Sequence, residues 1–152
     1  MNRFNEEYPK GDSGGNRFKL KYRYGVKSLH SLWDKVLYQE RKNIRRPISE
    51  KDWTKLSSRV DQIMANYTAA VQDPAVYENT DFDSWVSEGY EKAKPLYEGI
   101  TEYEKVPKEY LEANIPIAYE QILIGGYRLY YLIDYIFSDN DEVASASENF
   151  LN

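Results

Sequence analysis

Apolar and polar side chains alternate strictly over residues 17–24. The cations are Arg17, Lys19, Lys21 and Arg23, and the side chains between them are Phe18, Leu20, Tyr22 and Tyr24. Because successive side chains of an extended chain point to opposite faces, this period of two predicts a short β-strand or hairpin that ends near Gly25. Two interpretations are open: an amphipathic strand whose cations are solvated, or a surface on which aromatic rings stack bases while the cations attract phosphates.

Helical spacing begins directly after this segment. Ser28 is placed to cap a helix that we expect to end at the basic run over residues 41–46 and Pro47. The apolar stripe of this helix is Leu29, Leu32, Trp33, Val36 and Leu37. Ser49 and Asp52 then form a variant capping box, which predicts a second helix that ends before Pro74. Its apolar stripe is Trp53, Leu56, Val60, Ile63, Met64, Tyr67 and Val71.

Two further helices complete the expected fold. Residues 80–83 are expected to cap a short helix that ends at Pro95 and buries Phe82, Trp85, Val86 and Tyr90. The last helical region is predicted over residues 107–137, broken or kinked at Pro116, with a core stripe of Ile122, Leu129, Ile133 and Ile136. Gly125 and Gly126 are interpreted as positions of close helix packing. The pattern predicts a mainly α fold, with a domain over residues 1–137 and a polar tail over residues 138–152.

Length and composition are consistent with one folded domain. The chain has 152 residues and a mass of 17.9 kDa, and its 15 Tyr, 3 Trp and 5 Phe are too many aromatic residues for a disordered chain. It contains no cysteine. That absence excludes a disulfide framework, a cysteine-based zinc finger, an iron–sulfur site and a thiol nucleophile.

Charge is distributed unevenly along the chain. The net charge is -5, yet residues 1–59 contain 15 Lys and Arg against 7 Asp and Glu, and the remaining residues contain 5 against 18. The basic surplus in the first part indicates an anionic ligand there. The alternative is that a basic face docks on an acidic face within the same fold.

We expect no membrane-spanning segment and no secretory signal peptide. The most apolar stretch, residues 115–137, is interrupted by Glu120, Gln121, Arg128 and Asp134, which are costly in a bilayer. The first residues lack the apolar core region of a signal peptide. Asn66 begins an Asn-Tyr-Thr sequon, a candidate glycosylation site if the chain enters a secretory pathway.

His30 is the single histidine of the chain and precedes Asp34 by one helical turn. At this spacing both side chains point to the same side of a helix, at the edge of its apolar stripe. A histidine nitrogen and an aspartate oxygen can serve as two ligands of a zinc ion, which then needs at least one more ligand from elsewhere. The alternative is a solvated or locally hydrogen-bonded pair that binds no metal.

A glycine-rich loop, residues 11–16, precedes the alternating segment and reads Gly-Asp-Ser-Gly-Gly-Asn. Exposed amides of such loops can bind phosphate. This loop has neither the lysine of a Walker motif nor a helix directly after it, so a turn ahead of a strand is the simpler interpretation.

The order of these motifs resembles a known enzyme family. The glycine-rich loop, the basic strand and Leu-His-Ser-Leu-Trp-Asp at residues 29–34 are similar to a passage of the zinc-dependent single-strand nucleases (nuclease S-one/P-one type, in the phospholipase C/P-one nuclease superfamily). Gly-Gly-Tyr-Arg-Leu at residues 125–129 looks like that family's closing helix. The resemblance covers about residues 11–137.

The resemblance implies a mainly helical enzyme with a trinuclear zinc cluster in a cleft. Such enzymes cleave phosphodiesters of single-stranded DNA and RNA to 5′-phosphorylated products, often remove 3′-phosphates, and are secreted or lie in endomembrane or lysosomal compartments. Matched residue by residue, His30 and Asp34 correspond to two ligands of one zinc ion. Gly14, Gly15 and Asn16 correspond to a substrate-binding loop near the site. The cluster would activate water and neutralise phosphate charge.

The chain departs from the family pattern in its number of ligands. The family requires an amino-terminal Trp, further His and Asp residues and a His-rich segment, whereas this chain has one histidine. We therefore expect the carboxyl-terminal portion of such a nuclease, working with the missing amino-terminal half or a partner chain. The alternative is a catalytically inactive helical remnant or a protein-interaction module.

Overall fold

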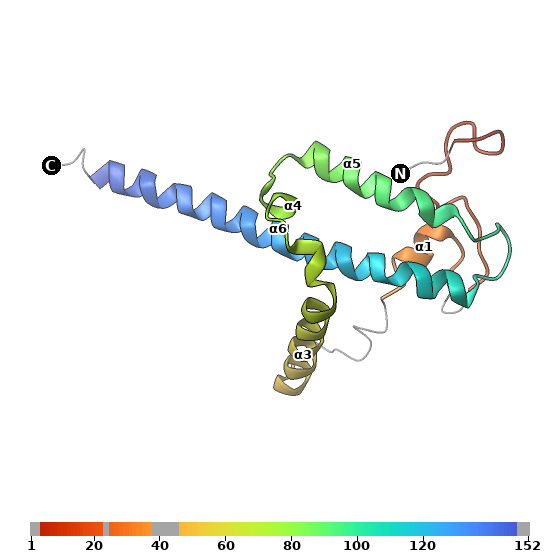
Figure 1. The fold of residues 1–152 in the computed structure, drawn as a ribbon, viewed down its shortest axis with the longest axis horizontal. Helices are drawn as coiled ribbons and strands as arrows, with labels where there is room; N and C mark the ends of the chain where they lie inside the picture. Colours follow the sequence, from red (N-terminus) through yellow and green to blue (C-terminus); the bar gives the residue numbers. More distant parts are fainter. Residues whose placement is uncertain (1–3, 23–24, 38–45, 149–152) are drawn as a thin grey trace. The chain divides into compact units, whose positions relative to one another are not determined.

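The computed structural model describes residues 4–22, 25–37 and 46–148, with side chains described as far as residue 138. Its α-helices are α1 (Leu29–Trp33), α3 (Glu50–Tyr67), α4 (Ala75–Glu78), α5 (Phe82–Ala93) and α6 (Lys108–Glu148), and its 3-10 helices are η1 (Thr68–Val71) and η2 (Lys94–Tyr97) (Figure 1). The prediction of a mainly α fold is confirmed. The chain divides into two compact units, Met1–Leu56 with Phe82–Ala118 and Ser57–Asp81 with Tyr119–Asn152.

In the first unit, the alternating segment is extended but pairs only through isolated bridges within the described residues. Lys19 bridges Ser28 in antiparallel orientation, and Lys21 bridges Lys105 in parallel orientation. Phe18 and Leu20 are buried while the lysines are exposed. The amphipathic alternation is thus confirmed in a hairpin-like turn that forms bridges rather than a regular strand, and Phe18 is not available to stack bases. Arg23 and Tyr24 lie outside the described residues.

The core of the first unit joins this hairpin to α1 and the start of α6. Its buried members are Phe18, Leu20, Val26, Leu29, Leu32, Val106 and Tyr110. The Phe18 ring meets Tyr97 edge to face with 5.6 Å between centroids, and Trp33 meets Tyr110 in the same way at 6.4 Å. A helix of five residues is unstable by itself, so this packing is what holds α1 in place.

The first helix is shorter than predicted. It ends at Trp33, and residues 34–37 form turns in which Lys35 N donates to Leu32 O at 3.1 Å. This bond to the third preceding residue is tighter than the α-helical pattern, which explains why the helix does not continue. The predicted stop at residues 41–46 falls almost wholly on residues 38–45, outside the described part.

The cap predicted at Ser49 is present, whereas the apolar stripes predicted for the next two helices are buried only in part. Asp52 N donates to Ser49 Oγ at 3.2 Å at the start of α3. None of the described side chains of α3 or α5 is fully buried. The exposed ones that we expected in the core include Trp53, Val60, Met64, Phe82, Val86 and Tyr90. Trp85 is half-buried. Val71, the last residue of the stripe predicted for the second helix, is buried in η1 with Tyr67 packed beside it, so the end of that stripe does reach a core.

The last helix is continuous through Pro116, so a break there is wrong, while the alternative of a kink stays a prediction. Proline removes the backbone donor that would bond to the carbonyl of Glu112, four residues earlier. Glu112 is exposed, so water can satisfy this carbonyl and the helix tolerates the proline. The helix also continues beyond Phe137 to Glu148. In the part of the chain that the structure describes, no helix is both long enough and apolar enough to span a membrane.

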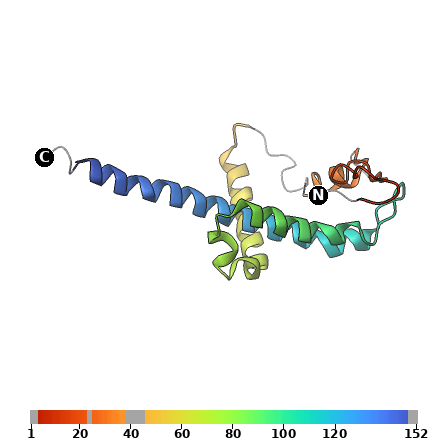
Figure 2. The same cartoon turned by 90° about the horizontal axis from the view of Figure 1, so that it is seen from above.

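The second unit has a small core on one side of α6. Val71, Leu123 and Ile124 are buried there, with Tyr67, Val76, Tyr77 and Tyr127 packed against them. Arg128 Nε donates to Val76 O at 2.9 Å and ties α6 to α4. Figures 1 and 2 show the end of α3 crossing α6 rather than running along it, so the two helices share a short contact.

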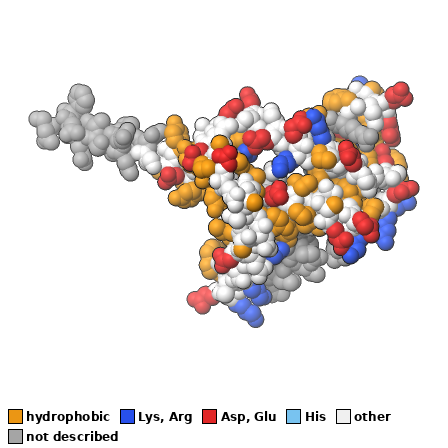
Figure 3. Space-filling view, in the orientation of Figure 1, with side chains coloured by type: hydrophobic (Ala, Val, Ile, Leu, Met, Phe, Trp, Pro, Cys, Tyr) orange, Lys and Arg blue, Asp and Glu red, His pale blue; other side chains and the backbone are white. Residues whose placement is uncertain are grey.

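The stripe of α6 that we predicted to be buried is exposed, and a different face of the helix packs. Ile122, Leu129, Ile133 and Ile136 are 47–59% exposed, and apolar side chains interrupt the polar surface seen in Figure 3. The helix carries apolar residues on more than one face, so periodicity did not select the one that packs. A Cβ at Gly125 or Gly126 would meet nothing within 4 Å beyond its own helix backbone and chain neighbours, so these glycines do not serve close packing within the described part of the chain.

Candidate metal-binding site

His30 and Asp34 lie together at the surface of the first unit, as their spacing predicts. His30 Nε2 is 3.4 Å from Asp34 Oδ2, and the two side chains are 48% and 61% exposed. Both remain accessible to an ion from solvent. Their geometry is that of an ion pair if the imidazole is protonated, or of two facing acceptors if it is neutral.

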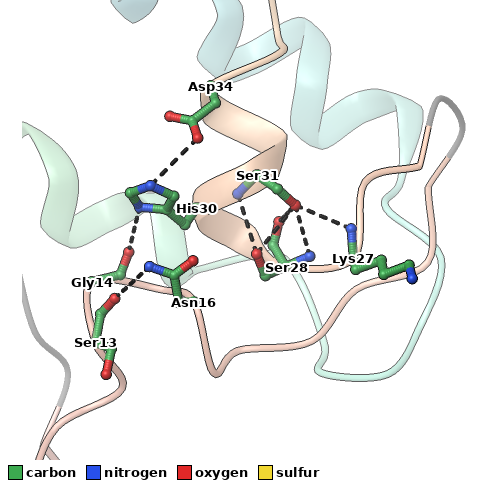
Figure 4. Close-up of polar contacts among 8 residues, drawn as sticks. All are labelled: Ser13, Gly14, Asn16, Lys27, Ser28, His30, Ser31 and Asp34. Atoms are coloured by element: carbon green, nitrogen blue, oxygen red, sulfur yellow. Dashed lines mark hydrogen bonds and ion pairs between the residues drawn. The ribbon is translucent and has the colours of Figure 1, made fainter.

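A backbone carbonyl decides which imidazole nitrogen faces the carboxylate. Nδ1 of His30 lies 3.2 Å from Gly14 O, so the proton assigned to Nδ1 is donated to this carbonyl (Figure 4). In the neutral ring the Nε2 lone pair then points toward Asp34. A lone pair and a carboxylate oxygen at this distance repel unless a proton or a metal cation lies between them. A carbonyl bonded to the second nitrogen is also the usual support of a metal-binding histidine.

The glycine-rich loop contacts α1 at the histidine itself. His30 N donates to Gly15 O at 3.3 Å. Gly15 has a φ of +83°, and a Cβ there would lie 3.1 Å from His30 N. Only glycine combines this backbone conformation with so close an approach. The structure therefore brings together Gly14, Gly15 and His30, although the whole alternating segment lies between the loop and the histidine in the sequence.

Asn16 has a structural role in the same loop. Its side-chain Nδ2 donates to Ser13 O at 2.9 Å, and its own carbonyl accepts from Lys19 Nζ at 2.7 Å. The side chain is exposed, so it remains accessible to a ligand. A substrate contact of Gly14, Gly15 or Asn16 stays a prediction.

The start of α1 is fixed by a reciprocal capping box. Ser31 N donates to Ser28 Oγ at 3.2 Å, and Ser28 N donates to Ser31 Oγ at 3.0 Å (Figure 4). These bonds satisfy two backbone donors and set the direction in which His30 leaves the helix. The sequence indicated Ser28 as the cap, and the structure adds Ser31 as its partner.

Asp12 supports the loop from inside and was not singled out from the sequence. Its side chain is fully buried and accepts a hydrogen bond from Tyr97 OH at 2.6 Å, while its carbonyl accepts from Arg17 N at 3.0 Å. A buried carboxylate requires such partners. The signal for it was its place in the Gly-Asp-x-Gly-Gly-Asn motif, which identifies the residue but not its partner Tyr97.

Two buried tyrosines of the first unit have raised pKa values. Burial raises the pKa of Tyr110, which packs on Trp33, to about 12. Burial, and then the hydrogen bond that its hydroxyl donates to Glu102, hold the pKa of Tyr8 above its usual range. Both hydroxyls therefore stay protonated at neutral pH and act as donors.

Two donors of types that zinc binds lie side by side at His30 and Asp34. No group of three or more His, Cys, Asp or Glu residues in the described part of the chain is arranged to hold a metal ion. Zinc is bound by three or four protein ligands in its structural and catalytic sites. The His30 and Asp34 side chains thus match zinc in donor type and in support, but they are fewer than such a site requires, and their role as metal ligands stays a prediction.

Comparison with known proteins identifies a family that includes this chain. A family model described as S1/P1 Nuclease matches residues 4–138, which includes the glycine-rich loop, the hairpin and the His30–Asp34 pair. The chain belongs to the S1/P1 nuclease family. The resemblance seen in the sequence motifs is thereby confirmed, and the match also covers α3 and α5, for which no motif was identified.

Two endonucleases of Arabidopsis thaliana are similar to this S1/P1 family member. Endonuclease 2 is 27% identical over 135 residues, which cover 83% of this chain and 44% of that protein. Endonuclease 1 is 25% identical over 150 residues, which cover 90% of this chain and 45% of that protein. The chain thus spans somewhat less than half the length of these relatives. No solved structure matches it.

Proposed function

We propose that this chain contributes the His30–Asp34 part of a zinc-dependent nuclease site. The enzyme would be an endonuclease and 3′-nucleotidase that hydrolyses single-stranded DNA and RNA to 5′-phosphorylated products. The observation that carries the proposal is the orientation of His30, whose Nδ1 is bonded to Gly14 O and whose Nε2 faces Asp34 Oδ2 at 3.4 Å. The family membership and the names of the two relatives support it.

Zinc fits these two donors, and His30 Nε2 and Asp34 Oδ2 would hold it. When bound, it would supply an activated water and neutralise charge on the phosphate. The chain's own residues do the positioning. Gly14 O fixes the tautomer and the ring plane of His30, and the Ser28–Ser31 capping box fixes the helix that carries both donors.

The remaining ligands would come from the rest of a nuclease domain, either as the amino-terminal half or as a partner chain. Support for such a partner comes from the apolar surface of the second unit, which no described residue covers. A groove of about 450 Å³ lies there, and its lining includes Val60, Ile63, Met64, Ile122, Gly126 and Tyr130. Exposed apolar surface of this kind marks an interaction site. Its occupant would be an apolar face of the remaining part of the domain.

A chimera tests the proposal. In Arabidopsis Endonuclease 2, the segment that this chain matches is replaced by the chain, and cleavage of single-stranded DNA and RNA oligonucleotides is measured with zinc. We expect cleavage with 5′-phosphate ends, lost in His30→Ala and retained in Glu112→Gln, which changes an exposed carboxylate elsewhere. Equal cleavage by a folded His30→Ala chimera would contradict the assignment. Full activity of the chain alone would show that it holds more zinc ligands than His30 and Asp34.

A second candidate function is a non-catalytic helical module. It is favoured by the incomplete ligand set and by the uncovered apolar groove. Under this alternative, His30→Ala changes neither zinc binding nor cleavage by the chimera, whereas Met64→Glu in the groove abolishes association with the remaining part of the domain.

We also propose that the protein is secreted or enters an endomembrane compartment, and that Asn66 is then glycosylated. Asn66 is exposed on α3, and counting 100° per residue places it about 120° from the groove-lining face of that helix. A glycan at Asn66 would therefore leave the groove open. In a secreted or endomembrane form of the protein, this is the position that we expect to be modified.

A further inference from the structure

The glycine-rich loop that supports His30 also binds an ammonium group. Lys19 Nζ donates to Asn16 O at 2.7 Å, two residues along the loop from the Gly14 carbonyl that holds the imidazole. One short loop thus ties together the proposed metal ligand and a cation. The alternating pattern alone presented Lys19 as one of four equivalent cations.

Lys19 is held firmly in place at the hairpin. Its neighbours Phe18 and Leu20 are both buried, so its side chain must point outward. Its backbone N donates to Glu102 Oε1 at 2.9 Å, and its carbonyl accepts from Tyr103 N at 2.7 Å. The position from which the ammonium reaches the loop is therefore fixed by the core and by two hydrogen bonds.

The charge of Lys19 is not neutralised by an acidic neighbour. The nearest carboxylate in its bonding network is Glu102, whose two oxygens are engaged by Lys19 N and by Tyr8 OH. Within the described residues no carboxylate forms an ion pair with Lys19 Nζ. An ammonium group has three donors, and the loop carbonyl uses one of them. Two donors remain for an anion.

We propose that Lys19 is a positioning residue that binds a non-bridging phosphate oxygen of the nucleotide next to the one at the His30–Asp34 site. This inference rests on the proposed function and assigns a polymer contact beyond the metal ligands. Lysine binds phosphate as a point charge, and such contacts fix the register of a strand without reading its bases. Because only a strand supplies this second phosphate, the contact would make the enzyme bind a strand more tightly than a single nucleotide.

Binding of a fluorescent oligothymidylate to the full chain without metal tests this proposal. Anisotropy is measured across a salt series for the wild type, Lys19→Gln, Lys19→Arg and Lys21→Gln. Lys21 is the matched control, because it lies on the same exposed face but makes no described side-chain bond to the loop. We expect Lys19→Gln to weaken binding by about tenfold and to reduce the salt slope by about 0.7, the value for one phosphate on a single strand. Lys19→Arg and Lys21→Gln should bind like the wild type.

Zinc affinity separates positioning from structural support. If the Lys19–Asn16 bond merely holds the loop, Lys19→Gln will also weaken zinc binding at His30. We expect zinc affinity to stay unchanged. Oligonucleotide binding by Lys19→Gln that equals the wild type or Lys21→Gln overturns the proposal while leaving the nuclease function intact. A wild-type chain that binds zinc but no oligonucleotide overturns the proposal together with the substrate class.

Discussion

Replacing Gly15 with alanine should damage both the fold and the metal site. Gly15 has a φ of +83°, and the added Cβ would lie 3.1 Å from His30 N and 3.3 Å from Leu29 Cβ. The left-handed backbone costs alanine about 1–2 kcal/mol, and the tight contact adds about 1 kcal/mol. The free energy of unfolding should therefore fall by about 2–3 kcal/mol.

The same substitution should weaken zinc binding. The contact pushes α1 away from the loop, so the hydrogen bond between His30 Nδ1 and Gly14 O lengthens and the imidazole loses its fixed orientation. Loss of such a supporting bond lowers metal affinity by about tenfold. Urea unfolding followed by circular dichroism measures the stability, and calorimetric zinc titration at a temperature well below unfolding measures the affinity.

Gly25→Ala is the matched control for this prediction. Gly25 also has a positive φ, +69°, but a Cβ there would meet no described atom within 4 Å. Gly25→Ala should therefore suffer the backbone strain but not the close contact. Its free energy of unfolding should fall by about 1–2 kcal/mol, and its zinc affinity should stay unchanged. If Gly15→Ala and Gly25→Ala are equally destabilised and bind zinc equally, the close approach of the loop to His30 does not matter.

Three other substitutions test separate parts of the structure. Gly126→Ala should raise the free energy of unfolding by about 1 kcal/mol, because α6 gains helix propensity without a clash, and an unchanged or lowered value in urea would refute this. The pKa of Tyr110 is raised from 10.0 to about 12, so its contribution is complete below pH 10 and is lost between pH 10 and pH 12; relative to Tyr110→Phe, the wild type should lose about 2–3 kcal/mol over that range, and parallel curves would contradict it. Secreted from a eukaryotic host, the chain should carry an N-glycan that Asn66→Gln removes, and a glycan-free mass for the wild type would exclude the site.

The sequence predicted the local features of the fold well. Ser28 and Ser49 cap helices as predicted. Such a cap is readable from the sequence because the serine hydroxyl bonds a backbone N–H only three residues further on. The alternation of Phe18, Lys19 and Leu20 likewise indicated which side chains are buried. Each of these predictions depends on interactions within a few residues.

Predictions that depend on distant contacts failed. The α6 stripe through Ile122 and Leu129 is spaced as a core stripe, but the packed side of the helix is that of Leu123 and Ile124, because η1 and α4 approach there. Helical periodicity identifies an apolar face but not the segment that covers it.

The candidate site was predicted in its residues but not in its support. His30 and Asp34 were chosen from their spacing and from the resemblance, and the structure places their side chains 3.4 Å apart. The Gly14 carbonyl on Nδ1 and the Asp12–Tyr97 hydrogen bond could not be predicted, because each joins residues that are distant in the sequence.

Calorimetric titration of the full chain with zinc tests the central claim most directly. The variants are His30→Ala, Asp34→Asn and Glu112→Gln, the last of which changes an exposed carboxylate one helical turn from Lys108 just as Asp34 is one turn from His30. We predict that the wild-type chain binds one zinc ion weakly, because two ligands are fewer than a tight site needs, that His30→Ala binds none, that Asp34→Asn binds it more weakly than the wild type, and that Glu112→Gln binds it as the wild type does. Zinc binding that is the same in His30→Ala and the wild type would contradict the account.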